Sequence, residues 1–105
     1  MLIDIKDSQK FKEFKKNKDK EEYKKIRGSV MASLERYYFG GMSPGGYVRG
    51  VLENDLLKAL SHSSPEHGEE AFTIAKFAYN VLPARAWGSK ENVDAWINEE
   101  GLGGC

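Results

Sequence analysis

A glycine-rich segment between two aromatic clusters, residues 37–47, constrains the fold of this chain more than any other feature. It reads Tyr-Tyr-Phe-Gly-Gly-Met-Ser-Pro-Gly-Gly-Tyr and precedes an amphipathic stretch. Glycine occurs where the backbone takes positive φ or where another group approaches closely, and elsewhere it costs folding entropy. Ser43 followed by Pro44 is typical of an N-cap and a first helical residue, which puts Gly45 and Gly46 in the first helical turn. The segment therefore predicts a tight interhelical turn whose N–H groups form a natural anion site.

The charge of the chain is unevenly distributed, although its formal total over 105 residues is zero. Residues 1–28 hold ten Lys and Arg against six acidic residues, and the remainder holds six against ten. The interspersed acids favour a solvated Lys/Glu helix, and the alternative is an arm for nucleic acid or an acidic partner. The acidic remainder makes a dedicated duplex-DNA binder a poor interpretation, since such domains are strongly basic.

Cysteine, histidine and hydropathy patterns exclude several classes of protein. Cys105 is the only cysteine, so neither a disulfide framework nor a cysteine-based zinc site is expected. His62 and His67 flank a short loop, but no carboxylate or cysteine completes a ligand set, and we predict no metal or cofactor. No apolar run is long enough to span a bilayer and no signal peptide is evident, so we expect a soluble cytoplasmic protein.

Apolar residues recur at helical spacing along most of the chain. The helical segments cover about residues 7–25, 23–37, 44–60 and 71–82, with a last helix after Ser89. Gly28 interrupts the second of these segments and indicates a break or a fresh helix start. Residues 71–82 are apolar nearly all round, which is typical of a central buried helix, and Pro83 ends it. We therefore predict an all-α bundle of about four helices.

The same pattern divides the chain into three parts. Residues 1–28 form a Lys-rich N-terminal helix with little apolar surface, which we expect to be partly mobile or loosely packed. Residues 29–100 form the helical core domain. Residues 101–105 form a flexible tail.

At about 100° per residue, Asp55 falls on the apolar face of the helix that follows the turn. An unpaired buried carboxylate is costly, so Asp55 needs a partner. The structural candidates are the indole N–H of Trp87 or Trp96 and the backbone N–H groups near Ser89. The functional alternative makes Asp55 a ligand-orienting acceptor, or a general base that works with Asn54 in acid–base or hydrolytic chemistry. Because no recognised catalytic set is evident, we do not expect an enzyme.

The residues around the turn suggest how an anion would be held. Arg49 lies one helical turn beyond the glycines, where it would either supply charge to the anion or pair with Glu53. Tyr38 or Tyr47, if its ring is exposed, would stack on a base. The turn lacks the signatures of a Walker loop and of a dinucleotide-binding strand–helix unit, so it carries no specific phosphate motif.

Several short motifs together resemble a family of small phage and prophage proteins. They are the stretch 41–56 (Gly-Met-Ser-Pro-Gly-Gly-Tyr-Val-Arg-Gly-Val-Leu-Glu-Asn-Asp-Leu), the stretch 79–83, and Trp-Gly-Ser at 87–89. The family shares a Pro-Gly-Gly turn, a Val-Leu-x-Asn-Asp-Leu helix and a Trp-Gly-Ser helix start, and the likeness covers residues 37–97. It implies an accessory protein of the bacterial cytoplasm rather than a particular reaction. Gly50 departs from the alanine of many relatives and is expected to loosen its helix.

We therefore expect an anti-defence binding protein that captures a small anionic, nucleotide-like ligand, such as a cyclic nucleotide, without turnover. The ligand-binding residues would be Tyr38, Ser43, Gly45, Gly46, Tyr47, Arg49 and Asn54. A chain of this length has little room for a deep pocket, so a site shared within a homo-oligomer is expected. The alternative is a protein inhibitor or adaptor that docks on a host defence complex through the Lys-rich helix or an acidic face.

Overall fold

The computed structural model describes residues 9–61 and 68–101, and these residues form helices joined by turns, with no strand among them. The elements are α1 (Gln9–Lys18), the 3-10 turn η2 (Glu21–Tyr23), α2 (Gly28–Gly40), α3 (Gly46–Leu52), α4 (Leu56–Ser61), α5 (Gly68–Val81), the 3-10 turn η4 (Ala84–Ala86) and α6 (Lys90–Asn98). The predicted all-α bundle is confirmed. The predictions for His62, His67 and Cys105 lie outside the described residues.

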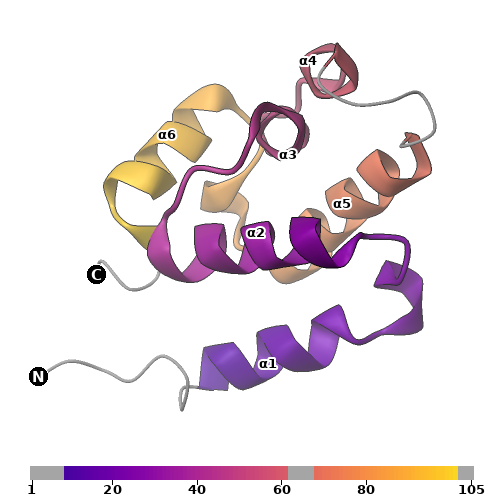
Figure 1. Cartoon of the computed structure of the whole chain (residues 1–105). Helices are drawn as coiled ribbons and strands as arrows, with labels where there is room; N and C mark the ends of the chain where they lie inside the picture. Colours follow the sequence, from indigo (N-terminus) through magenta and orange to yellow (C-terminus); the bar gives the residue numbers. More distant parts are fainter. Residues whose placement is uncertain (1–8, 62–67, 102–105) are drawn as a thin grey trace, which may run out of the picture.

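Helix α2 is the centre of the bundle (Figure 1), with α1 along one side and α3, α4 and α6 beyond the other. Its aromatic C-terminal half supplies much of the core. The Tyr37 hydroxyl donates to the Ala86 carbonyl at 2.6 Å, and the Trp96 indole donates to the Tyr37 carbonyl at 2.9 Å. Two buried donors thus join α2 to η4 and α6, and each is satisfied, as buried polar groups must be.

The N-terminal helix contacts this core through two aromatic residues, Phe14 and the partly buried Phe11, whose ring lies 5.5 Å from that of Phe39. Phe14 is buried, and its ring lies 5.6 Å from that of Tyr38, 5.4 Å from Phe39 and 5.4 Å from Phe77. Such rings contribute both buried area and favourable edge contacts. Phe14 thus docks the Lys-rich helix on the core, while most other side chains of α1 are exposed.

Two glycines bring the end of the chain against the end of α2. Gly41 has φ +67° and ends the helix, with its N–H donating to the Tyr37 carbonyl at 2.9 Å. A Cβ atom on Gly41 would lie 2.6 Å from the backbone of Glu100, and one on Gly101 would lie 2.6 Å from the Gly41 nitrogen. Positive φ and close approach both require glycine here, as predicted for the turn. Gly101, predicted to begin a flexible tail, is buried in this contact.

The predicted helix over residues 44–60 is wrong in its continuity, because the chain forms two short helices there. Helix α3 ends at Leu52, Asn54 takes a left-handed φ of 62°, and α4 begins at Leu56. The two helices pack closely at Gly50, where a Cβ atom would lie 2.6 Å from the Ala59 nitrogen. Gly50 is therefore required by the packing of α4 against α3, and is not simply a weak helix residue.

Candidate functional site

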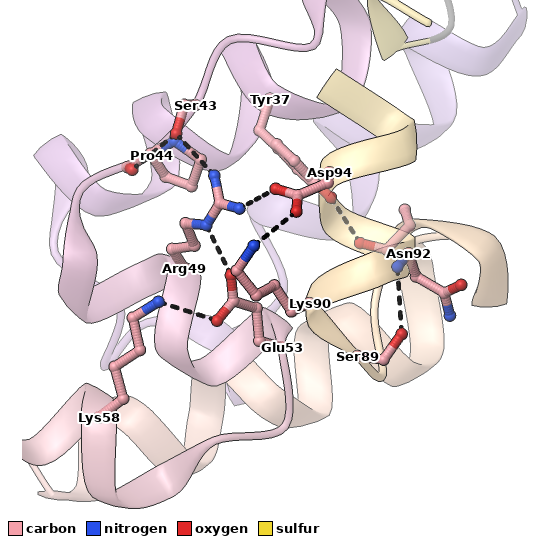
Figure 2. A network of polar contacts seen from close by, with 11 residues as sticks. Tyr37, Ser43, Pro44, Arg49, Glu53, Lys58, Ser89, Lys90, Asn92 and Asp94 are labelled. Atoms are coloured by element: carbon pink, nitrogen blue, oxygen red, sulfur yellow. Dashed lines mark hydrogen bonds and ion pairs between the residues drawn. The ribbon is translucent and has the colours of Figure 1, made fainter. Parts of the chain in front are cut away.

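Arg49 on α3 is the centre of a polar network that joins three elements (Figure 2). Its Nε donates to Glu53 Oε2 at 2.6 Å, its Nη1 donates to Ser43 Oγ at 3.3 Å, and its Nη2 pairs with Asp94 on α6. The predicted Arg49–Glu53 pair is confirmed. Because the guanidinium is mostly buried and has protein partners on all three nitrogens, its charge is already compensated within the fold.

Glu53, rather than Asp55, is the buried carboxylate of this region. Its second oxygen accepts a hydrogen bond from Lys58 Nζ at 2.9 Å, so that Glu53 ties α3 to α4. Burial by itself raises the pKa of Glu53, but the hydrogen bonds from Lys58 and Arg49 outweigh it and hold the pKa below its ordinary value. The Glu-x-x-x-x-Lys spacing does not indicate this pairing, which depends on the turn at Asn54.

The expectation that Asp55 is buried is wrong. Asp55 is exposed and lies at the N-cap of α4, where its carboxylate accepts from the Lys58 N–H at 3.0 Å and its carbonyl accepts from the Ala59 N–H at 3.0 Å. Asn-Asp between apolar segments is a typical turn and cap signal. Asp55 therefore stabilises a helix start.

The predicted partners of Asp55 have other roles. The Trp87 indole donates to the Leu82 carbonyl at 3.1 Å, and the Trp96 indole donates to Tyr37. Ser89 is the N-cap of α6, as predicted, and its hydroxyl accepts from the Asn92 N–H at 3.1 Å. None of these groups contacts Asp55 among the hydrogen bonds of the described residues.

Neither tyrosine beside the turn offers an exposed ring face. Tyr38 is 5% exposed and lies between Phe14 and Trp96, with ring centroids at 5.6 and 6.1 Å. Tyr47 is 9% exposed, and its hydroxyl donates to the buried carboxylate of Glu70 at 2.9 Å. The expectation of a stacking platform on either ring is wrong, because both rings belong to the core.

The Glu70 carboxylate anchors α5 to the start of α2. It accepts from the Arg27 backbone N–H at 2.8 Å and from the Arg27 Nε at 2.9 Å, in addition to Tyr47. Burial raises its pKa, but the bonds from Arg27 and Tyr47 together lower the pKa below the ordinary value. Spacing along the sequence does not indicate these pairings, since Arg27 and Tyr47 lie 43 and 23 residues away from Glu70.

The predicted ligand residues are therefore not assembled into one open site. Gly45, not Ser43, is the N-cap of α3, and Gly46 is its first residue. Ser43 contacts Arg49, whereas Asn54 lies beyond the far end of α3. Helix α3 has seven residues, so its N-terminus has a small dipole at most. Anion capture at this turn stays a prediction.

An exposed apolar face on α4 and α5 is the feature that sequence reasoning missed. Leu56 and Leu57 on α4 are 60% and 81% exposed, and Phe72 and Tyr79 on α5 are 66% and 72% exposed, with the Tyr79 ring 5.7 Å from that of Trp87. A groove of about 360 Å³ runs between the two helices, and its lining includes Leu56, Leu60, Gly68, Ala71, Phe72 and Ala75. The prediction that α5 is buried all round is thus wrong on this face. The signal was the apolar character of residues 71–82 on nearly all sides, which is found in a helix that binds a partner as well as in a central buried helix.

A second groove, of about 500 Å³, lies where η2 meets α2. Lys18, Lys24 and Arg36 line it together with two acidic residues, and Lys18 pairs with one of these, Glu35, at 3.2 Å. Its lining charges are of mixed sign, so this groove is not a purely basic surface.

Comparison of the chain with protein families, curated proteins and solved structures finds no match in any of the three. Within residues 9–61 and 68–101, no cluster of three or more His, Cys, Asp or Glu side chains is arranged to hold a metal ion. Within the same ranges, no helix has the length and apolar character needed to cross a membrane.

Proposed function

We propose that this chain is a non-enzymatic binding protein that acts by holding a protein partner on the exposed face of α4 and α5. The observation that carries the proposal is that Leu56 and Phe72 are largely exposed and line one groove between α4 and α5, with Leu57 and Tyr79 exposed on the same two helices. Contiguous exposed apolar patches are typical of sites of protein association. Complete burial of one such side chain contributes about 1.5–3 kcal/mol, from which the entropy cost of association is subtracted, so several must be covered together.

The orientation of α4 supports this proposal. Ala59 is buried and faces α3 at its contact with Gly50. At about 100° per residue, Leu57 points almost directly away from Ala59, and Leu56 lies to the side that faces α5. Leu57 is accordingly 81% exposed and makes no use of its apolar side chain within the fold. A partner that covers this helix gives Leu57 a role.

The local contacts favour a protein partner over a small anion. Arg49 would have to leave Glu53 and Asp94 in order to bind a phosphate, and the buried Glu53 would lose one of its two cations. The hydrolytic alternative at Asp55 loses its premise, because that carboxylate is exposed and caps α4. The resemblance to phage and prophage proteins makes a bacterial host protein, such as a defence component, the first class of external partner to examine.

Site-specific photo-cross-linking tests the proposal. A photoreactive phenylalanine analogue replaces Phe72, and in a matched control it replaces Lys12, which is exposed on α1. After irradiation in bacterial cells, position 72 is expected to give a discrete protein adduct, and position 12 is not. The adduct should weaken when Leu57→Asp is added, because that change places a charge on the same face. No adduct at position 72 above that at position 12 overturns the proposal.

A further inference from the structure

The exposed side of α5 has the spacing of a helix–helix seam. Gly68, Phe72, Ala75 and Tyr79 are all exposed and are separated by four, three and four residues. This is the alternation of a and d positions that brings successive side chains onto one stripe of a helix. The opposite side of α5 packs into the core through Ile74, Phe77 and Ala78. The stripe is therefore a second packing face of α5.

We infer that the occupant of this face is a second copy of the chain, whose α5 lies antiparallel to that of the first. This inference rests on the proposed function and names its partner. The stripe alternates small and large residues in the order Gly, Phe, Ala, Tyr. We place the two-fold axis midway along α5, at the level of Thr73 and Ile74. Phe72 then faces Ala75 of the second copy, and Tyr79 faces Gly68 of the second copy. Each large ring thus meets a small residue, as close packing requires.

The charges beside the stripe are self-complementary in the same arrangement. Glu69 and Lys76 are seven residues apart and lie on one flank of α5. In an antiparallel pair this flank faces its own counterpart, so Glu69 approaches Lys76 of the second copy with an axial offset of about 3 Å. Both side chains are long enough to span that offset. Both residues are exposed; Glu69 pairs with Lys25 at 2.9 Å, and the Lys76 ammonium lies 5.3 Å from the Phe72 ring centroid.

Helix α4 extends the same interface. It borders the groove on the flank opposite to Glu69 and Lys76, where Leu56 lines the groove. Two-fold symmetry places both α4 helices on one flank of the paired α5 helices, so Leu57 of each copy adds to one apolar surface. A helix of another protein would also cover the stripe. It would not explain why large residues, the small residues that accommodate them and both signs of charge all occur on α5, at spacings that match in an antiparallel pair.

Sedimentation equilibrium of the full chain tests the inference. The expected species has twice the mass of the 11.8 kDa chain, with a concentration-dependent dissociation to monomer. Phe72→Glu should abolish the dimer, and because Phe72 is exposed the helical circular-dichroism spectrum should be unchanged. Glu69→Lys and Lys76→Glu should each weaken the dimer by about three- to tenfold, because each creates two like-charge contacts. The double variant Glu69→Lys/Lys76→Glu should dimerise with about the dissociation constant of the wild-type chain.

Three results overturn the inference. They are a wild-type chain that stays monomeric at high concentration, a dimer that Phe72→Glu leaves intact, and a double reversal no better than its single variants. A monomeric chain whose position 72 still forms an adduct with another protein overturns the second-copy inference and leaves the proposed function standing. Absence of any adduct at position 72 overturns both.

Discussion

Replacement of Gly50 by alanine tests the central packing contact behind the exposed face. The added Cβ atom would lie 2.6 Å from the Ala59 nitrogen, 2.8 Å from its Cα and 3.0 Å from its Cβ. Carbon contacts are favourable at about 3.5–4.0 Å, so α4 would have to move away from α3 by nearly 1 Å. Two of these three atoms belong to the backbone, so no side-chain rotation relieves the clash. Overpacking of this kind costs about 1–3 kcal/mol.

The gain in helix propensity acts in the opposite direction and is worth about 1 kcal/mol. We therefore expect Gly50→Ala to lower the free energy of unfolding by up to about 2 kcal/mol, and each kcal/mol corresponds to roughly 4–8 °C in Tm for a small domain. The measurement is urea unfolding followed by circular dichroism. Gly28→Ala is the matched control, because no atom lies within 4 Å of its Cβ position at the start of α2. It should be neutral or slightly stabilising, and a Gly50→Ala chain as stable as Gly28→Ala would refute the packing argument.

Three further predictions concern the polar groups. Asp55→Ala should cost about 1 kcal/mol through the lost N-cap and Asp55→Asn almost nothing, whereas equal losses in urea unfolding would contradict the capping role. Arg49→Ala should cost about 2 kcal/mol by the same measurement, because buried Glu53 then keeps only Lys58; an unchanged stability with loss of nucleotide binding would restore the anion site. Hydrogen bonds hold the pKa of Glu53 and of Glu70 below the ordinary value of 4.5, so both ionised carboxylates stabilise the fold above that pH. The urea midpoint should therefore fall as the pH is lowered through the pKa values that these groups have in the folded chain. A midpoint that does not change below pH 4.5 would contradict this last prediction.

The sequence predicted most helices correctly because periodicity and end signals agreed. Ser89 caps α6, and α5 ends at Val81, two residues before Pro83. The predicted interruption at Gly28 is the start of α2. Such features depend on residues close together in the chain, which is where single-sequence reasoning is strongest.

The main error lay in treating residues 44–60 as one helix. The helical periodicity continues past the Asn54-Asp55 turn, so it gave Asp55 an inward direction that the turn changes. Asn54 adopts the left-handed conformation, and Asp55 caps the next helix. Asn-Asp was therefore a local signal strong enough to override the periodic pattern.

Long-range contacts account for the other differences. Arg49 meets Asp94 across 45 residues of sequence, and Tyr47 meets Glu70 across 23. Neither pairing can be derived from spacing along a helix. From the sequence, aromatic residues near a glycine turn are equally consistent with a buried core and with an exposed stacking surface. Tyr38 belongs to the core because Phe14 of α1 and Trp96 of α6 pack against its ring.

The most direct test of self-association through the α4 and α5 face, as against anion capture at Gly45 and Gly46, is a set of ¹H–¹⁵N correlation spectra, recorded on dilution and again with added nucleotides. The account predicts concentration-dependent shifts at the amides of Phe72, Lys76 and Tyr79, and no response at Gly45 or Gly46 to any nucleotide. Saturable nucleotide shifts at Gly45 and Gly46, with α5 amides independent of concentration, would contradict it and return the function to capture of an anion.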